Sequence, residues 1–275
     1  MINDPVVRKH KEVDHKSIYF SMAGFSFKLN YTYRDKDFIK GFKGIYKNYL
    51  LKIEPDKIDY TFFLITKNDV QLLRKKNKNG FYIKFFEILN KKVFVNLIIY
   101  PLYTQIVFRY VLLELLSINN GFLFHASGNI INKEIVLFTG KSGIGKSTVM
   151  TSLIDKHKPF VDDMACIRKI DSNFYCFKIP FYGKNESEIL NEQPNLIRAI
   201  FLLERGSSTK IVKVDKIKVI DKLISQLWAE KNYLAAQTKN MYNFISSFNK
   251  LYIFNIGQIN KINSVFNYQL EKKLF

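Results

Sequence analysis

The stretch from Glu134 to Thr148 constrains this chain most, because it joins an apolar run to a glycine-rich turn. Residues 135–138 are apolar and favour extended structure, so they predict a buried strand. From Gly140 the chain reads G-x-x-x-x-G-K-S, the pattern of a phosphate-binding P-loop, and the residues after it are compatible with a helix. The sequence therefore supplies the strand, loop and helix in which this pattern binds a nucleotide.

The residue types in the loop suit the triphosphate of ATP. Glycines allow the positive φ angles that turn successive backbone N–H groups toward phosphate oxygens. We expect the Lys146 ammonium to reach the β- and γ-phosphates and the Ser147 hydroxyl to bind Mg²⁺. The expected nucleotide-binding residues are Gly140, Lys141, Ser142, Gly143, Ile144, Gly145, Lys146, Ser147 and Thr148.

Two adjacent aspartates, Asp162 and Asp163, are the second informative feature, and they follow the predicted helix and a return strand. Neighbouring strand residues point to opposite faces, so two carboxylates at a strand end are able to divide two tasks. One binds Mg²⁺, and the other accepts the proton of an attacking hydroxyl. His125 precedes the loop on another predicted strand, where it is either a core residue or a neighbour of the phosphates.

These segments resemble the catalytic core of the HPr kinase/phosphorylase superfamily. The resemblance lies in residues 125–127, 137–147 and 161–163, and residues 199–206 resemble the downstream part of HPr kinase-like proteins. It implies ATP- and Mg²⁺-dependent transfer of the γ-phosphoryl group to a serine hydroxyl. In the roles that it implies, Asp162 is the general base, Asp163 binds Mg²⁺ and Lys146 clamps the phosphates. The P-loop pattern adds Ser147 as a magnesium ligand, and His125 is kept as a further catalytic candidate.

The resemblance also implies a fold and a class of acceptor. The fold is α/β, a P-loop kinase core with a mixed sheet flanked by helices and related to phosphoenolpyruvate carboxykinase. We expect this core at residues 101–275, after a small β-rich N-terminal domain at residues 1–100. The chain lacks the glycine-rich signature that HPr kinase/phosphorylases carry after the aspartates, and residues 178–184 stand there instead. A serine-containing peptide, another protein or free serine therefore fits better than HPr, and homo-oligomeric assembly is left open.

Other classes of P-loop protein carry further motifs. GTPases carry D-x-x-G after the loop and transporter ATPases carry L-S-G-G-Q, and neither string occurs here. The T-K-x-D string at residues 66–69 resembles a guanine-reading motif but precedes the loop, so we treat it as accidental. A non-catalytic ATP-binding switch in a biosynthetic pathway would need the loop but no base. A kinase would also need a basic residue near the acceptor, and the candidates are Lys184, Arg198 and Arg205.

The formal net charge of +19 would ordinarily suggest a nucleic-acid partner. The lysines are scattered and no RNA-binding or helix-turn-helix signature occurs, so nucleic acid is not the expected partner. The apolar window at residues 93–118 is broken by Pro101, Arg109 and Glu114, which predicts a core helix and no membrane span. Without an apolar leader the chain reads as cytoplasmic, and Cys166 and Cys176 as buried free thiols.

Hydrophobic patterning predicts the remaining elements. Residues 74–80 read as a charged loop. Expected helices cover residues 36–49, 101–117, 214–228, 229–251 and 266–274. Expected strands cover residues 18–31, 58–66, 81–86, 92–99, 122–131, 135–138, 164–170, 174–179, 197–203 and 252–256.

Overall fold

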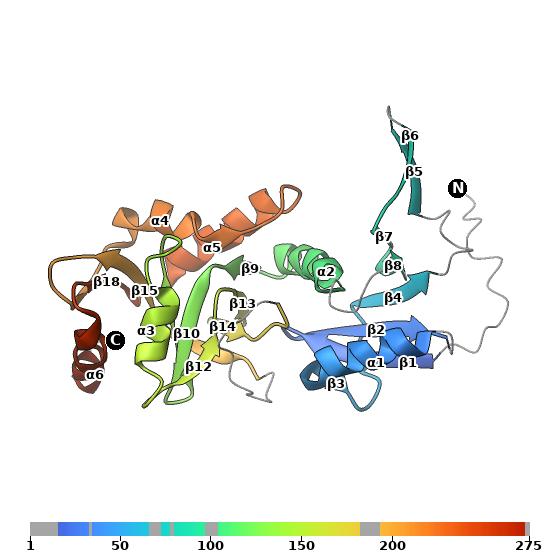
Figure 1. Ribbon diagram of the computed structural model, residues 1–275. Coiled ribbons are helices and arrows are strands. Elements are labelled where there is room, and N and C mark those ends of the chain that lie inside the picture. The colour runs from blue at the N-terminus through green and yellow to red at the C-terminus, as the bar shows by residue number, and fades with distance from the viewer. Residues whose placement is uncertain are drawn as a thin grey trace. The chain divides into compact units, whose positions relative to one another are not determined.

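The computed structural model describes residues 16–32, 35–65, 73–77, 80–96, 104–181 and 193–272. The chain divides into two compact units, Met1–Val107 and Phe108–Phe275, and each combines a sheet with helices (Figure 1). The domains predicted at residues 1–100 and 101–275 remain a prediction, because compact units are not by themselves independently folding domains. Pro101, residues 66–69 and Lys184 lie outside the described residues.

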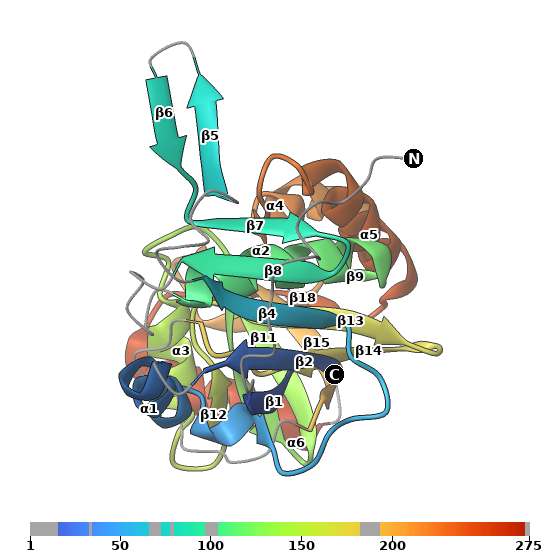
Figure 2. The ribbon, with the colours of Figure 1, turned by 90° about the vertical axis from the view of Figure 1, so that its right-hand side faces the viewer.

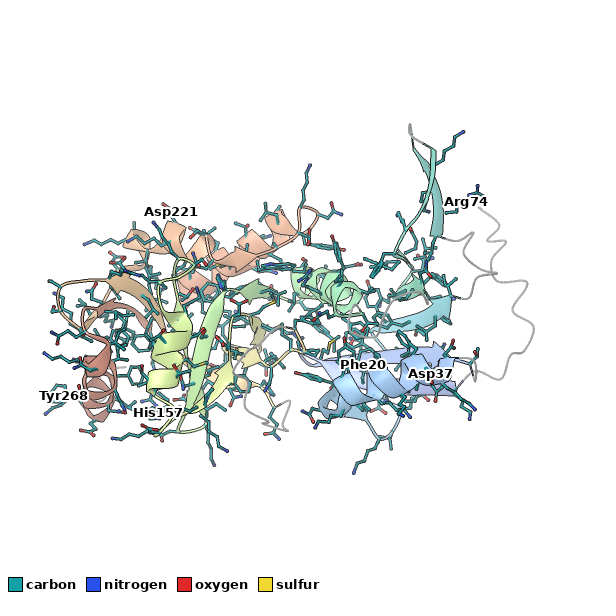
Figure 3. The ribbon with its side chains drawn as sticks, viewed as in Figure 1. Phe20, Asp37, Arg74, His157, Asp221 and Tyr268 are labelled. Atoms are coloured by element: carbon teal, nitrogen blue, oxygen red, sulfur yellow. The ribbon has the colours of Figure 1, made fainter. Side chains whose placement is uncertain are left out.

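Unit 1 is built on a six-stranded sheet, whose longer strands lie side by side in Figure 2. In β1 every second residue is buried, including Phe20, because one face of the sheet packs on the core. The ring of Phe42 from helix α1 (Lys36–Ile45) meets Phe20, labelled in Figure 3, edge to face at 5.6 Å. The strand order is β3 (Leu50–Leu51), β1 (Lys16–Met22), β2 (Phe25–Tyr31), β4 (Tyr60–Ile65), β8 (Lys92–Asn96) and β7 (Phe86–Leu89).

The charged loop predicted at residues 74–80 is wrong. Strands β5 (Arg74–Asn77) and β6 (Gly80–Ile83) form an antiparallel pair there, with Lys75 opposite Tyr82. Backbone pairing needs no apolar side chains, so a strand without apolar alternation escapes a reading based on hydrophobic pattern.

Unit 2 is built on a ten-stranded mixed sheet. Strands β11, β15 and β18 run parallel to one another, and the other pairings are antiparallel. The main path runs β12 (Lys158–Val161), β10 (Ala126–Ile131), β11 (Glu134–Thr139), β15 (Asn195–Arg205), β14 (Asn173–Phe177), β13 (Ala165–Ile170), β9 (Gly121–Phe124) and β17 (Leu227–Trp228). Strand β18 (Leu251–Ile256) also pairs with β15, and β16 (Lys210–Lys213) pairs with β18.

Helices cover both faces of this sheet, which makes unit 2 a mixed α/β fold (Figure 1). Ile135 and Leu137 of β11 pack with α4 (Ile220–Ile224) and α5 (Leu234–Ser247) on one face. Val136 and Phe138 pack with α3 (Lys146–Ser152) and α6 (Ile262–Glu271) on the other. Burial on both faces explains why β11 reads as an unbroken apolar run.

The helix predicted at residues 214–228 is wrong over much of its length. Only Ile220–Ile224 forms an α-helix, after a 3₁₀ turn at Lys216–Lys218. The end of the segment is strand β17, where Trp228 lies opposite Leu123 of β9. The apolar spacing that suggested a helix comes from Val219 and Leu223, which face the core. Pairing with β9 makes the end of the segment a strand, because tertiary contacts override local propensity. No helix within the described residues is both long and apolar enough to cross a membrane.

Two buried amides on α5 hold the end of helix α2 (Thr104–Ile118) against strand β9. The Asn240 side chain donates hydrogen bonds to the carbonyls of Leu116, Ser117 and Gly121 at 3.0–3.2 Å. The Gln237 side chain donates to the Leu113 carbonyl and accepts from the Leu123 amide. The last carbonyls of a helix lack intrahelical partners, so these amides satisfy groups that would otherwise be buried alone.

We expect Asn240→Ala to lower the free energy of unfolding by about 1–3 kcal/mol, because it strips buried carbonyls of their donor. Asn243→Ala, on the exposed face of the same helix, is the matched control and should change stability by less than about 0.5 kcal/mol. Urea unfolding of both variants measures the difference. Equal stabilities would contradict the anchoring role.

Candidate functional site

The glycine-rich turn joins strand β11 to helix α3, in the order that the sequence predicted. Gly140, Gly143 and Gly145 have φ angles of +144°, +74° and +109°, a region that favours glycine. A side chain at Gly140 would also stand 3.0 Å from the carbonyl oxygen of Leu203 on β15. The turn therefore needs glycine both for its backbone angles and for its close approach to the sheet.

Lys146 lies folded over this turn and is only 7% exposed. Its Nζ donates to the carbonyl oxygens of Gly140 at 3.1 Å and Lys141 at 3.4 Å. Burial lowers the pKa of Lys146, and the charges of Asp163 and Asp162 partly oppose that shift. The ammonium is thus held by the turn itself, near both carboxylates.

Opposite the turn, two antiparallel strand ladders stop short of each other. Phe124 of β9 lies opposite Ala165 of β13, and Gly128 of β10 lies opposite Val161 of β12. Residues 125–127 and 162–164 lie between the two ladders. Side chains bridge this gap, and it holds both His125 and the aspartate pair.

Asp162 is the buried carboxylate of the gap, with 4% of its surface exposed. Its Oδ1 accepts hydrogen bonds from Ser147 Oγ at 2.7 Å and from Ser127 Oγ at 2.9 Å. A buried carboxylate is costly without donors, and these two hydroxyls supply them. The structure thus joins the serine after the glycine turn directly to the first aspartate.

Asp163 points to the other side and contacts His125. Its Oδ1 lies 2.7 Å from His125 Nε2, and the two side chains are 62% and 31% exposed. Asp163 has a φ of +82°, a left-handed conformation that is uncommon outside glycine. Two hydrogen bonds fix the main chain of His125. Its backbone N–H donates to the Gln226 carbonyl, and its backbone carbonyl accepts from Thr139 Oγ1.

His125 and Asp163 both line a cavity of about 590 Å³ in unit 2. Arg109 from α2 and Trp228 from β17 line the same cavity, and the Arg109 Cζ lies 4.3 Å from the centre of the Trp228 ring. Sequence reasoning missed both residues. The signal in the sequence for Arg109 is a charged residue inside an otherwise apolar helix.

A second cavity, of about 400 Å³, lies on the side of the turn formed by Gly143, Ile144 and Gly145. Ile256, Ile259 and Ile262 give it apolar walls, and Arg205 is its charged lining residue. A third cavity of about 290 Å³ is lined by Gly140, Lys141, Arg205 and Gln226 among others, and Gln226 also lines the first cavity. Hollows therefore adjoin the turn on several sides.

The three basic residues that the sequence suggests near the acceptor differ in their position relative to the turn. Arg205, at the end of β15, lines two of the cavities beside the turn. Arg198, near the start of β15, pairs with Glu134 at 3.0 Å, at the end of β11 that is remote from the turn. Arg198 therefore lies at the end of β15 that is far from the turn, outside the candidate site. Lys184 belongs to residues that the structure does not describe.

The oxygen atoms of Ser147 and Asp162 suit a magnesium ion, which prefers few protein oxygens together with phosphate oxygens and water. Within the described residues, no group of three or more His, Cys, Asp or Glu side chains could hold a metal ion without such help. A hydroxyl and a carboxylate 2.7 Å apart form a donor set that fits Mg²⁺ on a nucleotide.

The surroundings of His157, Cys166 and Cys176 indicate structural roles. His157, labelled in Figure 3, contacts Asn267 of α6 at 3.0 Å and lies outside the cavity linings described above. Cys166 and Cys176 are buried and free, which confirms that prediction. Burial raises the pKa of Cys166 to about 12, so neither the charge nor the reactivity of a thiolate is available there.

Comparison with known proteins gives a distant structural similarity. No protein-family model matches the chain, and no curated protein matches its sequence. Among solved structures, the HPr(Ser) kinase/phosphatase from Coxiella burnetii aligns over 55% of this chain and 98% of its own, at 15% identity and a TM-score of 0.33. A similarity of that size carries no argument about function, so the site rests on its own geometry.

The lowered pKa of Lys146 predicts a pH effect on stability. Its ordinary pKa is 10.5, so as pH rises toward that value the unfolded chain keeps a proton that the folded chain has released. Stability therefore rises with pH in the native protein relative to Lys146→Met, which has no proton to lose. Urea unfolding over a pH series measures this difference.

Lys141→Met serves as the control, because Lys141 is exposed on the same turn. The native protein and Lys141→Met should follow similar pH curves, and Lys146→Met should diverge from both. Three parallel curves would mean that burial does not act on the Lys146 charge.

Proposed function

We propose that this chain is a phosphotransferase that moves the γ-phosphoryl group of ATP to the hydroxyl of a serine, either free or within a peptide or protein. The observation that carries the proposal is the 2.7 Å contact between Ser147 Oγ and Asp162 Oδ1. It joins a glycine-rich turn suited to phosphate with the carboxylate that a nucleotide-bound magnesium requires. A turn that only linked a strand to a helix would need neither group.

In this proposal the triphosphate lies in the turn formed by residues 140–148. Backbone N–H groups and Lys146 bind its oxygens. The cavity lined by Ile144, Ile256 and Ile259 holds the adenine base. Ser147 and Asp162 would hold Mg²⁺, which would supply positive charge to the triphosphate.

The contacts favour one division of labour between the aspartates. Resemblance implies Asp162 as base and Asp163 as magnesium ligand. In the structure it is Asp162 that touches the serine expected to bind Mg²⁺, whereas Asp163 faces the 590 Å³ cavity with His125. We therefore assign Asp162 to the metal side and Asp163 to the acceptor side.

The chain's own residues then act as follows. His125 orients the Asp163 carboxylate through their 2.7 Å contact. Asp163 takes the proton from the acceptor hydroxyl, whose oxygen forms the new bond to the γ-phosphorus as the bond to the leaving ADP oxygen breaks. Lys146 stays with the transferred group, and its position over the turn places its charge near the phosphates.

We expect Asp163→Asn to slow transfer by about 10²-fold or more while leaving affinity for ATP and Mg²⁺ unchanged, because the variant loses only the proton acceptor. Asp162→Asn should instead raise the Mg²⁺ concentration needed for half-maximal binding of the nucleotide. Mass spectrometry of free serine, a serine-ending peptide and a folded HPr-like protein after incubation with ATP and Mg²⁺ detects the transferred phosphate. Asp155→Asn, an exposed aspartate after α3, is the matched control.

The opposite pattern would assign the role of general base to Asp162. In that case Asp162→Asn would lose transfer with an unchanged Mg²⁺ requirement, and Asp163→Asn would alter the Mg²⁺ requirement. Bound ATP without transfer to any of the three acceptors would contradict the kinase and leave a non-catalytic switch.

A further inference from the structure

Arg109 and Trp228 form a feature of the 590 Å³ cavity that phosphoryl transfer itself does not need. The guanidinium of Arg109 stacks on the Trp228 ring at 4.3 Å, an arrangement that holds it in place against the cavity wall. The Arg109 Nε is enclosed by the protein, so a ligand in the cavity would meet the terminal N–H groups of the guanidinium. A cation held against Trp228 therefore lines the cavity that holds His125 and Asp163.

A cation held in place at the wall of a cavity favours an anionic ligand, because its charge and its terminal N–H groups are already positioned. Guanidinium binds oxyanions through two parallel N–H···O bonds, so a planar carboxylate matches it in shape and charge.

The charges in the cavity favour a carboxylate over a phosphate. Arg109 contributes one positive charge to the lining, and Asp163 contributes a carboxylate paired with His125. A singly charged carboxylate balances Arg109. A phosphate on the acceptor would add more negative charge beside Asp163 and the transferred phosphoryl group, where like charges repel.

We propose that Arg109 binds a carboxylate of the acceptor, with Trp228 as the apolar wall beside it. The acceptor is then a compound that carries both a hydroxyl and a free carboxylate, such as free serine or a serine at a peptide C-terminus, rather than a serine inside a protein chain. This rests on the proposed function, because it places the acceptor hydroxyl at Asp163.

Trp228 gives a direct reading of binding, since it is the only tryptophan of the chain. N-acetyl-L-serine and N-acetyl-L-serinamide differ at the carboxyl group and serve as the two probes. Titration of the native protein without nucleotide should change the Trp228 fluorescence with saturation, and the amide should bind about tenfold or more weakly. Arg109→Gln should abolish this preference, and Arg109→Lys should keep part of it.

Arg168→Gln is the matched control, because Arg168 also stacks on an aromatic ring, Phe177, but does not line the cavity. It should keep the full preference for the carboxylate. Equal affinity for the two probes, no response to either, or an unchanged preference in Arg109→Gln would each overturn the proposal.

The test separates this proposal from the kinase activity. Binding is measured without ATP, so a preference for the carboxylate that depends on Arg109 supports the acceptor site even if no transfer occurs. Conversely, transfer to N-acetyl-L-serinamide as efficient as transfer to N-acetyl-L-serine would overturn the carboxylate site and leave the kinase intact.

Discussion

The site depends on how one buried charge is satisfied. Asp162 is almost fully enclosed, and a carboxylate in that position needs donors within hydrogen-bond distance. Ser127 from strand β10 and Ser147 from helix α3 provide them. The contact therefore ties together the glycine turn and the gap between the strand ladders, and the position of Asp163 follows from it.

The gap creates two different environments within two residues. Asp162 turns toward the buried hydroxyls, and Asp163, with its left-handed φ of +82°, turns toward the cavity and His125. Helices pack on both faces of the sheet, and the α5 amides hold the end of α2 beside β9. The fold thus holds an enclosed carboxylate next to an accessible one.

Sequence reasoning found the parts of the site that are local. The turn from Gly140 to Ser147 shows in sequence because glycine, lysine and serine are needed at fixed spacing, and the strand and helix around it carry their own patterns. It could not pair Arg109 with Trp228, because α2 and β17 meet only through tertiary packing around β9. It also retained Arg198 as a candidate, since register along β15 decides which end of the strand faces the turn.

A crystal structure of the protein with Mg²⁺ and a non-hydrolysable ATP analogue tests the central claim most directly. The account predicts triphosphate oxygens within the turn formed by residues 140–148. It also predicts Mg²⁺ about 2.0–2.1 Å from Ser147 Oγ, with Asp162 beside the ion. A nucleotide bound elsewhere, or a Ser147–Asp162 contact with no ion near it, would contradict the account.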